Sequence, residues 1–153
     1  MDKLELFHLN FMVIIIMKKL GFIAPWYGDS IPGGAETELR GIVKLLAAAG
    51  VELEVLSTTV EKFMSDWSVD FHKPGLTTEG GINVRRFKVR KRNTAKFDAV
   101  NAKLIANQSV TPEEEETFMR EMVNSPDLYT YIQEHEDEYS LFIHIPYMFG
   151  TAY

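Results

Sequence analysis

The chain has no cysteine among its 153 residues. This absence excludes a disulfide framework, a thiolate metal site and a cysteine nucleophile, and it is typical of a protein of the reducing cytoplasm. No two of the histidines, at positions 8, 72, 135 and 144, have metal-ligand spacing on one predicted element. We therefore expect no metal ion to be bound.

Two nucleotide-binding motifs are also missing. The sequence contains neither the dinucleotide fingerprint G-x-G-x-x-G nor a P-loop ending in Gly-Lys-Ser/Thr. The formal net charge of −6 argues against a general nucleic-acid binder, because contacts with phosphates need clustered Lys and Arg. One basic run exists at 85–92, and it favours the solvated end of a strand. The alternative is a patch that attracts anionic lipid headgroups or a phosphorylated acceptor.

No apolar run is long enough to cross a bilayer. The longest, residues 9–17, falls short of the roughly 20 residues that a membrane helix needs, and the order of charges does not fit a signal peptide. Met17 resembles a natural start, with residues 1–16 as an apolar extension of open role. The extension is expected to cover apolar surface as a strand or helix, or to be partly disordered. Localisation is expected to be cytoplasmic, with peripheral contact at the inner face of the membrane as an open alternative.

Strand and helix patterns alternate along the rest of the chain. Short apolar or alternating runs predict strands, and apolar residues at helical spacing predict helices. Gly50 is a typical helix stop, and Thr111-Pro112 with Glu114 is a strong helix start. This order predicts an α/β fold, a Rossmann-like parallel sheet with flanking helices. The expected strands are 20–26, 51–58, 82–89 and 139–147; the expected helices are 36–49, 97–107, one from 111 and one from 125; residues 61–81 are expected to form a loop.

The most informative segment is 25–36, in which a predicted strand runs into Gly33 and Gly34 and then into a helix. Adjacent glycines let the backbone approach a ligand closely, and the helix start behind them presents unpaired N–H groups. This suits a diphosphate or a developing negative charge, although a strand-to-helix turn without a ligand fits the spacing equally well. The loop 27–35, the segment after Thr58 and the segment 144–150 are all expected at the carboxyl edge of the sheet, where ligands bind.

Several segments together resemble a known family. Residues 23–27 (Ile-Ala-Pro-Trp-Tyr), 32–36 (Pro-Gly-Gly-Ala-Glu) and 45–56 are similar to the N-terminal domain of a retaining glycosyltransferase of family 4. Further segments resemble a bacterial subgroup of that family, namely 81–87, Ser125-Pro126 and 146–151. The resemblance covers about residues 17–153.

The resemblance implies a GT-B architecture, in which two Rossmann-like domains face each other across a cleft. The N-terminal domain mainly binds the acceptor, a glycan or lipid-linked sugar, and the C-terminal domain mainly binds the nucleotide-sugar donor, with no metal required. The backbone of the glycine loop would lie against the donor diphosphate, and His144 would contact the transferred sugar. The residues implied are therefore Gly33, Gly34, Ala35 and Glu36 for the diphosphate, His144 for the sugar, and Tyr27, Asp29, Trp67 and Thr151 on the acceptor side.

Each of these residues also has an ordinary structural explanation. His144 between two isoleucines is typical of a hydrogen-bonded interior histidine, and Trp67 of an aromatic packed against the sheet. A glutamate in the first helical turn, such as Glu36, needs only the helix dipole to explain it. Turn residues such as Tyr27 and Asp29 often have no function.

The chain departs from the family in length. The donor-binding C-terminal domain and its E-x₇-E pair are missing, and Glu113 with Glu121 matches that spacing only by chance. We therefore expect no transferase activity without that domain, supplied in cis or in trans. The last predicted strand would be an exposed sheet edge, which residues 1–16 or a second copy of the chain would cover. The alternative function is a non-catalytic module that recruits a partner glycosyltransferase or a glycan.

Overall fold

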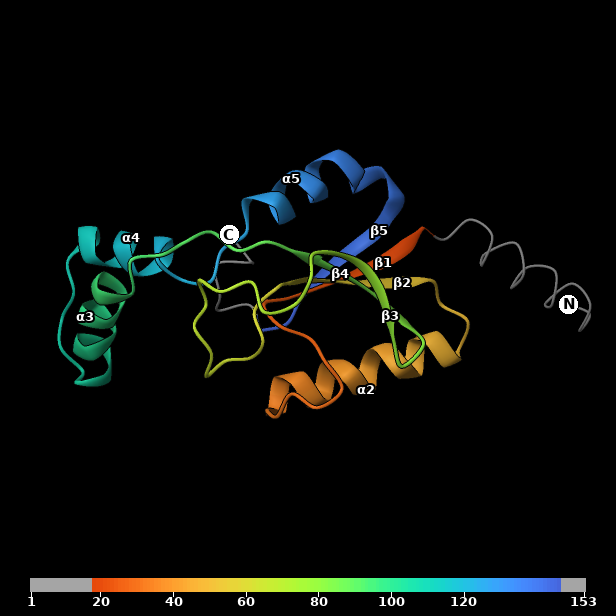
Figure 1. Ribbon diagram of the computed structural model, residues 1–153, viewed down its shortest axis with the longest axis horizontal. Helices are drawn as coiled ribbons and strands as arrows, with labels where there is room; N and C mark the ends of the chain where they lie inside the picture. Colours follow the sequence, from red (N-terminus) through yellow and green to blue (C-terminus); the bar gives the residue numbers. More distant parts are fainter. Residues whose placement is uncertain (1–17, 147–153) are drawn as a thin grey trace, which may run out of the picture.

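The chain forms an α/β fold around one five-stranded sheet (Figure 1). The computed structural model describes residues 18–146. The strands are β1 (Lys19–Ala24), β2 (Leu53–Thr58), β3 (Gly75–Glu79), β4 (Ile82–Phe87) and β5 (Tyr139–His144), in the order β3-β4-β2-β1-β5. β1, β2, β4 and β5 are parallel, and only β3 pairs antiparallel. The expected α/β class is confirmed.

The predicted helix bounds are confirmed to within three residues, the largest difference being the start of α3 at Thr94 instead of 97. The helices are α2 (Gly34–Ala48), α3 (Thr94–Ile105), α4 (Pro112–Arg120), α5 (Pro126–His135) and a 3₁₀ turn, η1 (Glu136–Glu138). Thr111 and Glu114 form a capping box, which satisfies two backbone donors at the start of α4. Gly50 adopts φ +81°, and the amides of Gly50 and Val51 donate to Ala47 and Leu46, a Schellman ending for α2.

Strand β3 corrects the sequence analysis, which predicts a loop over 61–81. Gly75–Glu79 pairs antiparallel with β4 through a two-residue turn at Gly80 and Gly81. Both glycines have positive φ, +56° and +83°, as the tight hairpin turn requires. Four of the five β3 residues are exposed, so the strand lacks the apolar alternation that identifies a strand in a sequence.

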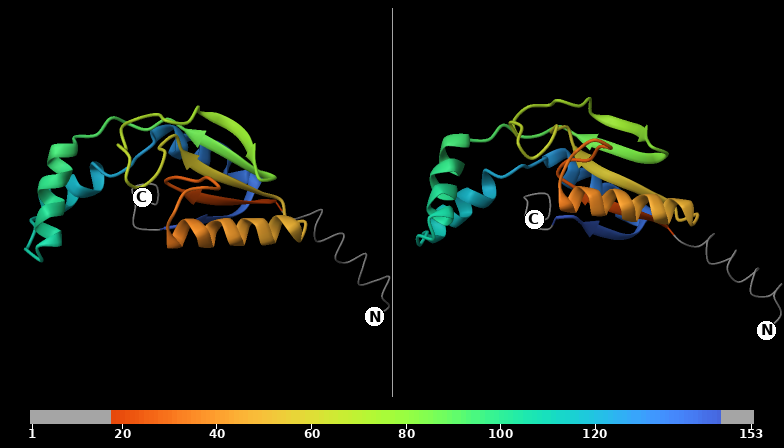
Figure 2. Two further views of the ribbon diagram at one scale, coloured as in Figure 1. Left: turned by 60° about the horizontal axis from the view of Figure 1, so that its bottom comes forward. Right: turned by 90° about the horizontal axis from the view of Figure 1, so that it is seen from below.

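Both faces of the sheet are covered, which explains the nearly continuous apolar strands. On one face, Phe22 and Val55 pack with Leu39 and Val43 of α2. On the other, Ile23, Leu56 and Phe87 pack with Leu128 of α5. Figures 1 and 2 show α2 and α5 on opposite sides of the sheet.

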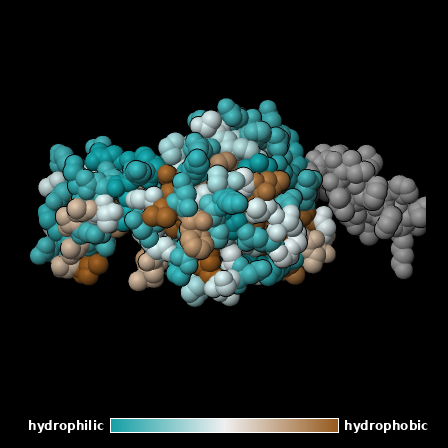
Figure 3. Space-filling view, viewed as in Figure 1, coloured by the Kyte–Doolittle hydropathy of each residue, from teal (hydrophilic) through white to brown (hydrophobic). Residues whose placement is uncertain are grey.

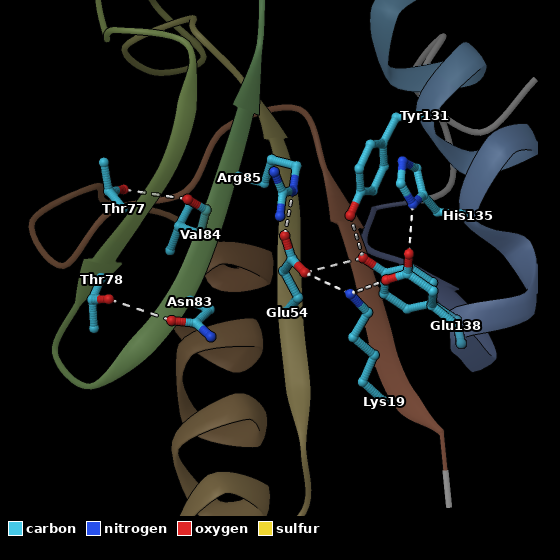
Figure 4. A network of polar contacts seen from close by, with 11 residues as sticks. Lys19, Glu54, Thr77, Thr78, Asn83, Val84, Arg85, Tyr131, His135 and Glu138 are labelled. Carbon is cyan, nitrogen blue, oxygen red and sulfur yellow. Dashed lines mark hydrogen bonds and ion pairs between the residues drawn. The ribbon is translucent and has the colours of Figure 1, made fainter.

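A buried carboxylate ties four strands together. The side chain of Glu54 on β2 is 5% exposed and accepts from Arg85 Nε on β4 at 2.6 Å, Lys19 Nζ on β1 at 3.2 Å and the Tyr139 hydroxyl on β5 at 3.1 Å (Figure 4). Arg86, next in the basic run, is 3% exposed. The predicted solvated strand end is therefore wrong for Arg85 and Arg86, because both guanidinium groups are held in ion pairs.

Helices α3 and α4 form a hairpin beyond the carboxyl ends of the parallel strands (Figures 1 and 2). Phe97 of α3 stacks on Phe118 of α4 with ring centroids 4.8 Å apart. The same Phe97 meets Trp67 from the segment after β2, which joins the hairpin to the sheet. In Figure 3 the outer surface of α4 and α5 is mainly hydrophilic, and apolar residues gather at the lower end of α3, where Ile105 is 79% exposed.

Strand β5 lies at one edge of the sheet. Among residues 18–146, β1 is the only strand whose backbone pairs with β5. The partner expected for this edge stays a prediction, because residues 1–16 lie outside the described residues. No helix within 18–146 has the length and apolar character needed to cross a membrane.

Candidate functional site

The order of the parallel strands reverses between β1 and β5. The order β4-β2-β1-β5 means that the chain leaves β1 toward one side for β2 and returns on the other side for β5. Doubly wound α/β proteins bind ligands at the carboxyl ends of the strands beside such a reversal. Ile23 and His144 are direct neighbours in the register of β1 and β5, so the half-buried His144 lies at this reversal.

The glycine loop follows β1 at the same edge. Gly33 has φ +139°, a backbone conformation that favours glycine, and a Cβ there would lie 1.9 Å from Glu36 Oε2. Glu36 is held in place because Trp26 Nε1 donates to its Oε1 at 2.6 Å. The glycine at 33 is therefore required by the folded-back Glu36 side chain and by the backbone itself.

Gly34 serves a different purpose. A Cβ at Gly34 would have no described atom within 4 Å, and the residue is exposed as the first of α2. No side chain of the described residues caps this helix start. Gly34 is therefore exposed at the positive end of a 15-residue helix, and the next two residues, Ala35 and Glu36, are half-buried.

Two arginines brace the loop that leads into α2. Arg86 donates to the Tyr27 carbonyl at 2.7 Å, and Arg40 donates to the carbonyls of Ile31 at 2.7 Å and Gly28 at 3.2 Å. Arg86 is almost fully buried, and a buried guanidinium that lost this hydrogen bond would destabilise the fold. Hydrogen bonds from β4 and from α2 therefore hold the loop in place.

The predicted acceptor-side residues divide into exposed and buried ones. Asp29 pairs with Lys44 at 2.9 Å, with half of its side chain exposed. Tyr27 is 3% exposed, and burial, with the nearby carboxylates of Asp29 and Glu79, raises the pKa of its hydroxyl to about 12. Tyr27 therefore stays protonated at neutral pH.

Trp67 is packed inside an aromatic cluster. It is 8% exposed, its ring lies 6.0 Å from Trp26 and 5.6 Å from Phe97, and Arg92 lies over it at 4.5 Å. Trp67 is therefore packed in the interior, as the structural explanation expects. A role of Trp67 in acceptor binding stays a prediction. Thr151 lies outside the described residues.

A hollow beside the glycine loop, lined by both charged and apolar side chains, was missed by the sequence analysis. It has a volume of about 480 Å³ and lies between 28–32, 61–64 and 71–72, with Glu79 of β3 on its wall. The signal that points to it is Gly80-Gly81, since two glycines between strand-forming runs are typical of a hairpin, and this hairpin places Glu79 there. His72 and Phe71 carry no local pattern that a sequence reveals.

No group of three or more His, Cys, Asp or Glu side chains within 18–146 is arranged to hold a metal ion. Comparison of the chain with models of known protein families, with characterised proteins and with solved structures found no match. The family resemblance therefore rests on the residues quoted above.

Proposed function

We propose that this chain is the acceptor-side N-terminal domain of a nucleotide-sugar-dependent retaining glycosyltransferase of GT-B architecture, active in bacterial-type glycan biosynthesis. The observation that supports the proposal is the exposed Gly34 at the start of α2, in the loop that follows β1. His144 ends β5, the strand that pairs with β1, at the same edge of the sheet.

The geometry suits the departure of a diphosphate. In sugar transfer the bond between the anomeric carbon and the diphosphate oxygen breaks, and negative charge grows on the leaving group. Backbone N–H groups at the start of α2 would stabilise that charge without any metal, because they are fixed before the reaction begins. His144 would contact the transferred sugar from the end of β5.

The rest of the donor site would belong to a second domain, in cis or in trans. A single Rossmann-like domain offers one wall of the cleft, so this chain by itself is expected to bind the donor weakly and to transfer no sugar. The proposal is therefore tested through binding at named residues rather than through turnover.

The test is a titration of ¹⁵N-labelled protein with UDP-glucose, GDP-mannose and ADP-glucose. We expect at least one donor to shift the amide signals of Gly33, Gly34 and Ala35. Gly34→Val places a branched side chain in the open space and should weaken this binding about tenfold. Gly41→Ala, also on α2 with no described atom within 4 Å of the added Cβ, is the matched control and should bind as the parent does. Unchanged binding by Gly34→Val, or no shift at the loop with any donor, would contradict the proposal.

A further inference from the structure

We propose that the hollow between 28–32, 61–64 and 71–72 binds a neutral polyhydroxylated ring, which, if the proposed function holds, is the acceptor sugar. The hollow of about 480 Å³ lies within the range of small-ligand sites. It is formed by the segments that follow β1 and β2, at the carboxyl edge of the sheet. Its walls combine charged side chains with exposed apolar ones.

Three carboxylates lie on the wall, and each is ion-paired. Asp29 pairs with Lys44 at 2.9 Å, Glu61 with Lys62 at 2.9 Å, and Glu79 with Arg86 at 2.5 Å. Of these three cations only Lys62 lines the hollow, so carboxylates outnumber cations on the wall and a free anion is not favoured. Carboxylate oxygens instead accept from the hydroxyl groups of a neutral ligand.

In two of these carboxylates, only one of the two oxygens is engaged in the ion pair. Asp29 bonds to Lys44 through Oδ1, and Glu79 bonds to Arg86 through Oε1. Within residues 18–146, Asp29 Oδ2 and Glu79 Oε2 make no hydrogen bond or ion pair. Each oxygen is free to accept from a ligand hydroxyl while its ion pair stays intact.

His72 also lines the hollow. Its Nε2 is buried, and no described atom lies at hydrogen-bond distance from it. Burial, together with the nearby Arg86 charge, lowers the pKa of His72, so the ring is neutral at pH 7. Because Nε2 is closed off from the hollow, His72 contributes a neutral ring to the wall and no hydrogen bond to a ligand.

An exposed aromatic ring completes the site. Phe71 lines the hollow and is 61% exposed, and its ring meets that of His72 edge-on at 4.9 Å. An aromatic face beside a few convergent polar groups is the usual composition of a small-ligand site. The apolar face of a sugar ring would lie on Phe71 while its hydroxyls reach Asp29 and Glu79, whose side chains are both accessible.

The experiment is a titration, by ¹H–¹⁵N NMR including the His72 ring, with methyl β-glucoside, methyl α-mannoside and methyl N-acetyl-β-glucosaminide up to 100 mM. Inorganic phosphate and glucose 1-phosphate are the comparison ligands. We expect at least one neutral glycoside to shift His72 and the amides of 28–31, with little effect from phosphate. Asp29→Asn and Phe71→Ala should each weaken this binding about fivefold or more. The matched controls Asp98→Asn and Ile105→Ala replace exposed residues on α3 and should not change it.

The inference is overturned if no glycoside shifts these signals, if phosphate shifts them more strongly, or if both variants bind as the parent does. All four substituted positions are exposed, so loss of folding is not expected, and circular dichroism checks it. Donor binding at Gly33–Ala35 is read from different amides in the same spectra. Glycoside binding without donor binding would therefore overturn the proposed function alone, and donor binding without glycoside binding would overturn this inference alone.

Discussion

Gly33 and Glu36 depend on each other at the start of α2. The Glu36 carboxylate folds back over the loop to reach the Trp26 indole, and it occupies the space that a side chain at 33 would need. A substitution at Gly33 therefore meets both a steric clash and an unfavourable backbone angle. The two loop glycines differ sharply in this respect, since Gly34 meets neither.

Gly33→Ala should lower the free energy of unfolding by about 2–3 kcal/mol, because alanine rarely adopts a φ of +139° and its Cβ would collide with Glu36. Urea denaturation followed by circular dichroism measures the change. Gly41→Ala is the control, and it should leave the stability unchanged or raise it by up to about 1 kcal/mol, the ordinary helix preference for alanine. Equal stability of Gly33→Ala and the parent would show that the loop does not have this geometry.

Glu138 makes stability depend on pH in the acid range. Its hydrogen bond with Lys19, followed by that with His135, lowers the pKa of the Glu138 carboxyl from 4.5 to about 2. The folded-state pKa lies below the unfolded one, so the stabilisation is complete above pH 4.5 and is lost as the pH falls toward 2.

The difference in melting temperature between the parent and Glu138→Gln should therefore narrow steadily below pH 4.5. Because Glu138 is exposed, the difference at pH 7 should be modest. Glu134→Gln, an exposed change on α5 outside any ion pair of the described residues, is the control. A gap between parent and Glu138→Gln that stays constant from pH 6 to 3 would contradict this assignment.

At the scale of elements, the sheet is held by contacts between residues far apart in sequence. Glu54 on β2 joins β4, β1 and β5, and Arg86 on β4 supports the loop after β1. No local pattern reveals these pairings. The basic run thus reads as a solvated strand end in the sequence, although its first two arginines are ion-paired with Glu54 and Glu79.

Glu54→Gln should destabilise the protein by about 3 kcal/mol, because it leaves the partly buried Arg85 guanidinium without its carboxylate and removes one of the two carboxylates that pair with Lys19. Glu52→Gln changes an exposed glutamate two residues away and should have little effect. Urea denaturation compares the two. A loss for Glu54→Gln no larger than that for Glu52→Gln would mean that the network contributes little.

The β3–β4 hairpin depends on its glycine turn. Gly81 has φ +83°, and an added Cβ would meet no described atom within 4 Å. The effect of a substitution at 81 therefore depends on backbone strain and not on a steric clash. Gly81→Val should lower the free energy of unfolding by about 1–3 kcal/mol and speed amide hydrogen exchange in β3. Gly81→Asn should have a much smaller effect on both, because Asn tolerates positive φ. Equal exchange rates in the two variants would argue against this turn.

At the scale of the whole molecule, the sequence predicted the strand–helix order and the parallel sheet well. Apolar runs at 20–24 and 53–58, the capping box at Thr111 and the stop at Gly50 all act locally, so a sequence shows them. The exposed strand β3 and the hollow beside the glycine loop were not predicted. Both depend on long-range pairing and on the segment 61–72, which has no regular period.

The sequence predicts at which edge of the sheet the candidate residues lie, but it does not predict the residues that line the neighbouring hollow. Gly33-Gly34 and His144 were expected at one edge of the sheet, and the register of β1 and β5 places His144 at the reversal point. His72 and Glu79 were not expected, because their position follows from the hairpin and from the path of the chain after β2. What each residue does at that edge stays a prediction.

The most direct test of the central claim is a crystal structure of the protein grown with a donor that binds it, UDP-glucose, GDP-mannose or ADP-glucose. We expect the diphosphate within hydrogen-bond distance of the amides of 34–36, with the sugar directed toward His144. A diphosphate held instead by the basic run at 85–92, away from the glycine loop, would contradict the claim that the functional site lies at the carboxyl ends of β1 and β5.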